Sequence, residues 1–283
     1  MIIEELPENA ARIVREWRRD GKTICLVPTM GYFHEGHLSL MKHGLQLADK
    51  VIVSLFVNPT QFGANEDLSV YPQDLEGDCH KAERTGVDLL FCPAASAVYR
   101  EKHQTVVSVK DVSNRLCGLN RPGHFDGVAT IVTKLFNMFS PEFALFGEKD
   151  YQQLVVIKTM VSDLDMPVTV KGVPTIREHD GLAMSSRNSY LDPEERAIAP
   201  VLYETLNDIR TSFKTKKTPA AVLPLVEKAK AKITRFTQCS VDYLEVFDER
   251  DLSPAEVISE NCRAAGAIRI NGKVRLIDNL SMK

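Results

Sequence analysis

The chain has 283 residues, of which 44% are hydrophobic and 26% charged, and its formal net charge is −3. This length suits one large domain or two unequal ones, and the composition is ordinary for a globular protein. The slight acidity excludes a protein-wide basic surface for nucleic acid, although a local basic pocket stays open. No apolar run approaches the roughly 18 residues of a membrane-spanning helix.

The cysteines and the N-terminal segment both favour a cytoplasmic protein. Six cysteines are scattered without a C-x-x-C pair, which indicates free thiols in a reducing compartment. They are Cys25, Cys79, Cys92, Cys117, Cys239 and Cys262. Residues 1–20 are acidic and then helical in pattern, so they lack the basic start and apolar core of a signal peptide.

Short apolar runs alternate with helical patterns along the first two thirds of the chain. Buried strands are predicted by continuous apolar, β-branched runs at residues 23–27, 51–57, 87–93, 143–147 and 168–173. Helices are predicted by apolar spacing at residues 8–19, 37–48, 73–85, 127–139 and 148–164. This alternation predicts an α/β fold, a Rossmann-like parallel sheet with helices on both faces.

The chain becomes polar and loop-like at residues 174–190, which predicts a domain boundary near residue 175. Two helices are expected beyond it, at residues 193–213 and 219–235. Short strands then follow at residues 241–247, 264–270 and 273–279. The second domain, residues 176–283, is therefore expected to be a smaller α+β unit.

Residues 28–40, PTMGYFHEGHLSL, follow the first predicted strand of the sheet, where ligands bind in open parallel sheets. Gly31 and Gly36 are spaced as in a P-loop, but its lysine and its serine or threonine are missing after Gly36. A helix expected to begin near His37 would direct free N–H groups at an anion, and His34 and His37 could donate to phosphate oxygens. A metal-binding pair and a solvated turn remain alternatives, the first without H-E-x-x-H spacing.

A second cluster is FGEKDYQQL, residues 146–154, which follows a predicted strand and opens a helix. Lys149, Asp150 and Gln153 are three or four residues apart and can share one helix face. A lysine, a carboxylate and an amide suit a triphosphate, Mg²⁺ and a polar substrate. The alternative is a helix start with a favourable acidic first turn.

Two further loops carry polar groups suited to a small ligand. Residues 183–191, AMSSRNSYL, place two hydroxyls and a guanidinium at Ser185 to Arg187, as in a lid that grasps phosphate. Residues 56–62, FVNPTQF, place Asn58 and Gln61 between aromatic residues, where amides can orient a small polar ligand. A common serine-rich loop and an Asn-Pro turn are the respective alternatives.

The histidine-bearing loop and the later serine–arginine segment together resemble the HxGH nucleotidyltransferase superfamily, with the motif at residues 34–37. Class I aminoacyl-tRNA synthetases share that layout. The whole chain closely resembles the pantothenate synthetase (pantoate–β-alanine ligase) family. The segments that carry the resemblance occur in the order PTMGYFHEGH, FVNPTQF, YPQD, RPGHFDGV, FGEKDYQQL, DGLAMSSRN and RLIDN.

The resemblance implies ATP-dependent condensation of pantoate with β-alanine to pantothenate. Pantoate would attack ATP to form a pantoyl adenylate and pyrophosphate, and β-alanine would then displace AMP. ATP and Mg²⁺ are implied, together with a cytoplasmic homodimer that uses neither nucleic acid nor a membrane. Residues 1–175 would bind ATP and pantoate, and residues 176–283 would form a lid domain.

The resemblance also implies which residues act on ATP. His34, His37 and Lys149 would be catalytic, and His37 occupies the position that the family treats as proton donor. The ATP-binding residues would be Met30, Gly31, Tyr32, Phe33, His34, Glu35, Gly36, His37, Gly147, Glu148, Lys149, Asp150, Ile176, Met184, Ser185, Ser186 and Arg187.

The other implied roles concern the small substrates and the metal. Gln61 and Gln153 would hold pantoate, and Gln61 would also lie near β-alanine. Asp150 would bind Mg²⁺. Arg121 and His124 in RPGHF are expected at the pocket wall without an assigned step.

Several alternatives stay open at this point. An adenylyltransferase would leave AMP on its product, and a nucleotide sensor would bind ATP without turnover. A metallohydrolase would use His34, His37 and His124 as ligands, and RNA binding by analogy with the synthetases has the least support. None of the cysteines lies within the four clusters, so they are expected to be dispensable for chemistry.

Overall fold

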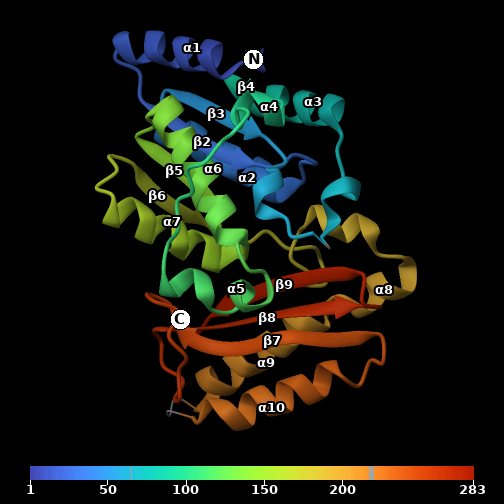
Figure 1. Ribbon diagram of the computed structural model, residues 1–283. Coiled ribbons are helices and arrows are strands. Elements are labelled where there is room, and N and C mark those ends of the chain that lie inside the picture. Colours follow the sequence, from blue (N-terminus) through green and yellow to red (C-terminus); the bar gives the residue numbers. More distant parts are fainter. Residues whose placement is uncertain (65, 217–219) are drawn as a thin grey trace.

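The computed structural model describes residues 1–64, 66–216 and 220–283. Two domains are stacked in Figure 1, a parallel α/β domain above and a smaller domain with an antiparallel sheet below. Residue 219, where the second helix of the smaller domain was predicted to begin, lies outside the described residues. Within the described ranges, every helix is too short or too polar to cross a bilayer.

The first domain contains six parallel strands in the order β1-β4-β3-β2-β5-β6. They are β1 (Ile2–Glu4), β2 (Ile24–Thr29), β3 (Lys50–Leu55), β4 (Leu89–Phe91), β5 (Phe143–Gly147) and β6 (Thr169–Val173). From β2 the chain moves outward through β3 to β4, and it later returns to place β5 on the other side of β2. The strand order therefore reverses between β2 and β5, where open α/β sheets bind ligands.

Helices cover both faces of this sheet, because side chains along each strand alternate between two cores. Ile24 and Leu26 of β2 belong to one core, whereas Cys25 and Val27 belong to the other. The helices against the first core are α1 (Pro7–Arg19), α6 (His124–Phe139) and α7 (Tyr151–Asp163). Those against the second are α2 (Glu35–Leu47) and α3 (Leu75–Thr85).

The second domain pairs β7, β8 and β9 in an antiparallel sheet and packs two helices on its outer face (Figure 1). Its elements are α8 (Pro193–Ile198), α9 (Val201–Lys216), α10 (Val222–Ile233), β7 (Cys239–Asp248), β8 (Cys262–Ile270) and β9 (Val274–Ser281). One helix was predicted over residues 193–213, but α8 and α9 are separate. Pro200 stands between them and lacks the N–H that a continuous helix would require.

The predicted strand and helix types of the first domain are confirmed, with two local corrections. Residues 2–4 form β1 beside β4, which the sequence analysis missed because three residues are too few to show a period. Helix α2 begins at Glu35, not near His37, because His34 is its N-cap. Short turns that were not predicted are α4 (Ala95–Val98), α5 (Cys117–Asn120), η1 (Pro59–Gln61), η2 (Asp67–Val70), η3 (Asp111–Asn114), η4 (Glu148–Asp150) and η5 (Ser186–Tyr190).

Strand β9 of the second domain is hydrogen-bonded to the turn that follows β5. The amide of Asn279 donates to the carbonyl oxygens of Glu148 and Lys149 at 2.9 and 2.8 Å. The guanidinium of Arg263 lies 3.8 Å from the ring centre of Tyr151. We propose residue 175 as the domain boundary, because β6 ends at residue 173 and the second hydrophobic core begins at residue 182.

Candidate active site

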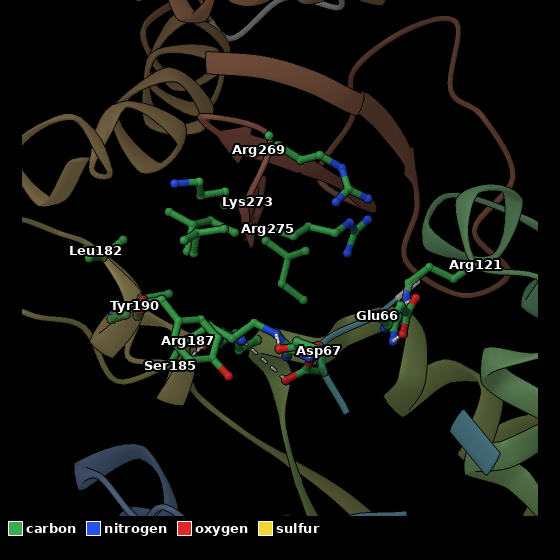
Figure 2. Close-up of a pocket in the computed structure, with 18 residues that line it drawn as sticks. Glu66, Asp67, Arg121, Leu182, Ser185, Arg187, Tyr190, Arg269, Lys273 and Arg275 are labelled. Carbon is green, nitrogen blue, oxygen red and sulfur yellow. Dashed lines mark hydrogen bonds and ion pairs between the residues drawn. The ribbon is translucent and has the colours of Figure 1, made fainter. Parts of the chain in front are cut away.

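Two connected cavities lie at the carboxyl edge of the parallel sheet. The inner one has a volume of about 180 Å³ and lies beyond the ends of β2 and β5. The outer one, about 330 Å³, lies between the two domains (Figure 2). Four residues line both cavities: Lys149, Asp150, Ser185 and Arg187.

Most residues predicted to bind ATP line the inner cavity. They are Met30, His34, Gly36, His37, Gly147, Lys149, Asp150, Ile176, Met184, Ser185, Ser186 and Arg187. Their convergence follows from the topology, because β2 and β5 are neighbours in the sheet. Cys25 pairs with Phe143 and Leu26 pairs with Ala144, although each pair is 118 residues apart in the sequence. Side chains from four separate segments therefore face one cavity.

The remaining predicted ATP-binding residues have side chains elsewhere. Gly31 and Tyr32 line a different cavity, between the histidine-bearing loop and α3. Phe33 is buried in the core between α2 and the sheet. Glu35 is exposed and lies 3.8 Å from Lys42, and Glu148 faces Arg263 at 3.9 Å. Their roles toward ATP stay predictions.

The residues 30–37, called the histidine loop below, hold both imidazoles at the start of α2. His34 Nδ1 accepts from the Gly36 N–H at 3.1 Å, and His37 Nδ1 accepts from the His34 N–H at 3.3 Å. Each neutral ring therefore carries its proton on Nε2, where it can donate. A Cβ on Gly36 would lie 2.8 Å from His34 Cε1, so glycine is required for this packing.

Burial and neighbouring cations keep both imidazoles neutral. Desolvation, with a smaller contribution from Lys149, lowers the pKa of His34 to about 4. Burial, His34 and Lys149 lower the pKa of His37 well below its usual range. The positive end of the helix dipole acts in the same direction. The loop thus offers neutral donors, not cations, to an anionic ligand.

Asp78 of α3 holds the histidine loop from behind and was missed by the sequence analysis. Its side chain is 1% exposed, and its two oxygens accept from the N–H groups of Tyr32 and Phe33, each at 2.6 Å. Gly31 and Tyr32 both have positive φ, at 86° and 53°, so this bend is strained for ordinary residues. The local sequence did not single it out, because the same helix also contains Glu76 and Glu83.

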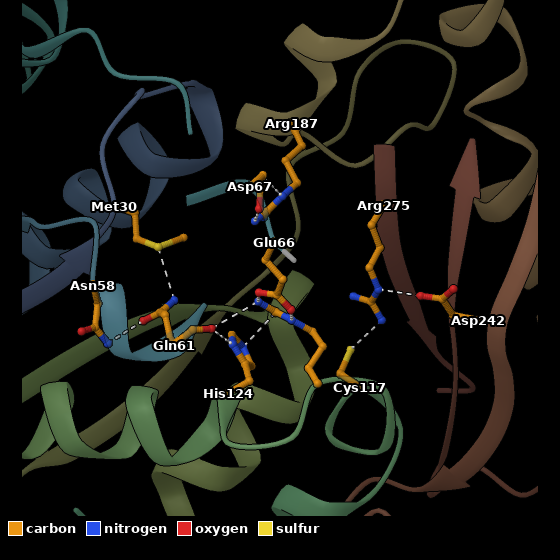
Figure 3. Close-up of polar contacts among 11 residues, drawn as sticks. Met30, Asn58, Gln61, Glu66, Asp67, Cys117, His124, Arg187, Asp242 and Arg275 are labelled. Atoms are coloured by element: carbon orange, nitrogen blue, oxygen red, sulfur yellow. Dashed lines mark hydrogen bonds and ion pairs between the residues drawn. The ribbon is translucent and has the colours of Figure 1, made fainter. Parts of the chain in front are cut away.

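A smaller cavity of about 70 Å³ adjoins the inner cavity and contains the two predicted pantoate residues, Gln61 and Gln153. Gln61 Oε1 accepts from Asn58 Nδ2 at 3.0 Å, and Gln61 Nε2 lies 3.3 Å from Met30 Sδ (Figure 3). A Cβ on Gly127 would lie 2.5 Å from the Thr60 carbonyl oxygen, so glycine lets α6 approach this turn.

The adjacent residues Gln152 and Gln153 face different surroundings. Gln152 is buried, accepts from the Cys117 N–H at 3.0 Å and donates to the carbonyls of Val112 and Arg115 at 2.9 and 2.6 Å. Gln153 lines the inner cavity, the small cavity and a third pocket near the second domain. One glutamine therefore supports the fold, and the other is open to ligands.

Arg121 and His124 form part of a polar network at the wall, as expected for the RPGHF segment. Figure 3 shows His124 in this network together with Gln61 and Glu66. His124 Nδ1 lies 2.7 Å from the Gln61 carbonyl oxygen, and its Nε2 lies 3.1 Å from Arg121 Nη1. Arg121 in turn forms a bidentate ion pair with Glu66. Both His124 nitrogens are thus engaged away from His34 and His37, and the described residues contain no cluster of three metal-ligating side chains.

The residues 183–190, called the serine–arginine loop below, reach the cavity from the side of the second domain. Arg187 Nε and Nη2 each lie 2.9 Å from a carboxylate oxygen of Asp67, and its guanidinium lies 5.3 Å from the ring centre of Tyr71. Ser186 Oγ donates to the Tyr32 carbonyl oxygen at 3.3 Å. The loop is therefore attached to the first domain by polar contacts.

One cysteine lies nearer to the site than its position in the sequence indicated, and the prediction that the cysteines are dispensable for chemistry stays a prediction. Cys117 lines the third pocket with Arg121 and Gln153. Its sulfur lies 3.2 Å from the Tyr243 hydroxyl and 3.5 Å from Arg275 Nη2. Nothing in the sequence around Cys117 indicates this, because the contacts come from β7 and β9.

A parallel sheet with neutral paired histidines at its switch point, faced by a lysine and a serine–arginine loop, defines an HxGH-type nucleotide-binding enzyme. The protein-family model of pantoate–beta-alanine ligase matches residues 2–281. The chain belongs to this family, whose members are also named pantothenate synthetases.

Individual relatives agree over nearly the full length. The pantothenate synthetase of Geotalea daltonii is 51% identical over 268 residues, 94% of each chain. That of Paramagnetospirillum magneticum is 50% identical over 270 residues, covering 95% of this chain and 94% of the relative.

Two solved structures share the fold. The pantothenate synthetase of Thermus thermophilus has a TM-score of 0.93 and 40% identity, covering 100% of this chain and 99% of the other. The pantoate–beta-alanine ligase of Francisella tularensis, complexed with beta-gamma ATP and beta-alanine, has a TM-score of 0.84 and 34% identity, with 100% and 98% coverage.

Proposed function

We propose that this chain condenses pantoate with β-alanine at the expense of ATP, through a pantoyl adenylate. The observation that carries this proposal is the position of Gln153, which lines both the inner cavity and the small cavity of Gln61. A small hydroxy acid held by the two amides would lie beside a nucleotide phosphate in the inner cavity. The ATP and β-alanine of the Francisella tularensis complex support the same two substrates here.

In the first step, a carboxylate oxygen of pantoate forms a bond to the α-phosphorus of ATP. The bond from that phosphorus to its bridging oxygen breaks, and pyrophosphate leaves with the electron pair. Alignment of two bound reactants can supply about 7–11 kcal/mol of the barrier. The Nε2–H groups of His34 and His37 and the ammonium of Lys149 are the donors we assign to the growing phosphate charge.

In the second step, the amine nitrogen of β-alanine attacks the acyl carbon of the adenylate. The acyl–oxygen bond breaks, AMP leaves with the electron pair, and the attacking nitrogen releases its proton to water. Gln61 lies at the small cavity and is our assignment for orienting pantoate and β-alanine. Neither step requires a covalent bond to the protein.

Asp150 fits a role in Mg²⁺ binding. Its carboxylate is 47% exposed, lines both cavities and lies 3.7 Å from Lys149 Nζ. Mg²⁺ in nucleotide sites typically uses one or two carboxylates together with substrate phosphates and water, which one aspartate at this position can provide. Asp150 would hold the metal, whose charge would offset that of the phosphates, and the ammonium of Lys149 would hold the phosphates directly.

Two properties of the whole enzyme complete the proposal. The serine–arginine loop and the second domain act as a lid over the triphosphate, with Ser185, Ser186 and Arg187 as its phosphate ligands. The free thiols support a cytoplasmic location, and the family resemblance supports a homodimer. Sedimentation equilibrium would measure the oligomeric state.

Exchange of labelled pyrophosphate into ATP tests the proposed reaction. We expect exchange with pantoate and Mg²⁺ present and β-alanine absent, because the adenylate forms before the amine is needed. Exchange that appears only with β-alanine would contradict a stepwise adenylate. Product analysis with all substrates separates this ligase from an adenylyltransferase, since a ligase releases AMP and an adenylyltransferase retains it on the product.

A further inference from the structure

We propose that the β8–β9 hairpin of the second domain contains a binding site for a diphosphate group, either the tail of bound ATP or the pyrophosphate that leaves. The site consists of Arg269, Lys273 and Arg275, which line the outer cavity opposite Arg187 (Figure 2). This inference rests on the proposed function, since pyrophosphate is the product of its first step.

The outer cavity adjoins the inner cavity, to which we assign the phosphates of ATP. Lys149 and Arg187 line both cavities, so a chain of phosphates that starts at the histidine loop extends past them into the outer cavity. The hairpin forms the opposite wall of that space. A departing pyrophosphate would therefore meet the hairpin before it reaches solvent.

The charge of the outer cavity favours a polyanion. Six cationic side chains line it, Arg121, Lys149, Arg187, Arg269, Lys273 and Arg275, against the three carboxylates Glu66, Asp67 and Asp150. Asp242 behind the hairpin accepts from Arg269 and Arg275 at 3.0 and 2.8 Å and neutralises one of them. An excess of positive charge remains, and a concave site concentrates its field.

The fold does not require all three cations of the hairpin for charge pairing. The one carboxylate of Asp242 serves both arginines, so Arg275 alone would keep it paired. Lys273 is exposed in the turn between β8 and β9, and its ammonium has no carboxylate within 4.0 Å among the described residues. Arg269 and Lys273 can therefore be replaced without leaving a buried charge unpaired.

The test is calorimetric titration of the full-length protein with inorganic pyrophosphate, in the absence of pantoate and β-alanine and at fixed ionic strength. The variants are Lys273→Ala, Arg269→Ala and the double variant. Lys228→Ala is the matched control, because Lys228 is an exposed lysine on α10 outside the cavity. Orthophosphate and ATP are titrated in parallel.

We expect each single change to weaken pyrophosphate binding about threefold to fivefold, and the double change about tenfold or more. Lys228→Ala should bind as the unaltered protein does. An equal loss for ATP would assign the site to the nucleotide tail, and a loss for pyrophosphate alone would assign it to the product; both support the site.

Three results would overturn the inference: pyrophosphate affinity within twofold of the unaltered protein in the double variant, an equal loss in Lys228→Ala, or orthophosphate binding as tight as pyrophosphate. Because this titration involves no turnover, it is independent of pyrophosphate exchange. A protein that binds pyrophosphate through the hairpin but shows no exchange would contradict the proposed function and leave the site standing.

Discussion

The histidine loop and the serine–arginine loop face the same cavity but are held there by different interactions. The histidine loop is bonded to the buried carboxylate of Asp78, and Phe33 anchors it in the core. The serine–arginine loop depends on the ion pair of Arg187 with Asp67, in which both side chains are about a quarter exposed.

This difference indicates that the histidine loop is preorganised, whereas the serine–arginine loop can exchange its contact with the protein for one with a ligand. Buried polar groups are costly to leave unpaired, so conformations of the histidine loop that break its bonds to Asp78 are disfavoured. A partly exposed ion pair contributes little to stability, so Arg187 can exchange Asp67 for a phosphate group at small cost. The following predictions test that comparison, from the largest expected effect to the smallest.

Lys149 lies between the two loops, and its loss should have the largest effect on the chemical step. We expect Lys149→Ala to slow adenylate formation by about 10²–10³, or about 2.7–4 kcal/mol, because the charge of departing pyrophosphate loses a donor. Single-turnover kinetics at saturating pantoate measures this. Lys158→Ala is the control, because Lys158 is an exposed lysine on α7, the helix that follows Lys149. A rate within threefold of the unaltered enzyme would remove Lys149 from the role.

Asp78→Asn should show that the histidine loop is held by a buried acceptor. The asparagine NH₂ would face one of the two N–H donors, so one buried donor loses its partner, at a cost of about 1–3 kcal/mol. We expect the free energy of unfolding and kcat/KM for ATP both to fall. In the control, Asp74→Asn, the replaced side chain accepts from Gly77 at an exposed helix start, where asparagine caps equally well. Equal effects of the two changes would contradict the prediction.

The neutral histidines should make stability depend on pH. The pKa of His34 is about 4 in the folded protein and about 6.5 in an unfolded chain. The unfolded chain therefore binds protons first, and the free energy of unfolding should fall as the pH drops from about 6.5 to about 4. His34→Asn keeps a capping side chain but does not titrate, so urea unfolding should show a shallower slope. An unchanged slope would exclude His34 as the cause.

Gln153 belongs to neither loop, so its replacement should change pantoate binding while both loops stay in place. We expect Gln153→Ala to raise the KM for pantoate by the equivalent of about 0.5–1.5 kcal/mol, with kcat changed less. The neighbouring change Gln152→Ala should instead lower the free energy of unfolding, because three backbone groups lose a buried partner. Steady-state kinetics and chemical denaturation of both variants measure these effects. A loss of stability in Gln153→Ala together with a raised KM for pantoate in Gln152→Ala would mean that the two roles are reversed.

Asp67→Asn should have the smallest effect, and it should lower the KM for ATP instead of raising it. It removes the carboxylate that competes with phosphate for Arg187, so the KM for ATP should fall about twofold to threefold, while stability changes by less than about 1 kcal/mol. Asp180→Asn is the control, because Asp180 pairs with Arg196 outside the cavities. A raised KM for ATP would mean that Asp67 positions Arg187 for ATP instead of competing for it.

The parallel sheet and its ligand loops were readable from the sequence, because they depend on short-range patterns. The apolar run at β2 and the glycines of the histidine loop lie within a few residues of one another, as do Lys149 and Gln153 after β5. The ordered motifs also identified the family. A three-residue strand such as β1 is too short to produce such a pattern.

Only the tertiary structure revealed the partners that hold these loops in place. Asp78 is 45 residues from Phe33, and Arg187 is 120 residues from Asp67. Nothing in the local sequence distinguishes Gln152 from Gln153, since burial depends on what packs against α7. The hairpin cations and Cys117 likewise reach the site only because the second domain docks on the first. Local periodicity predicts which element a residue joins, whereas the packing of distant elements determines which atoms meet.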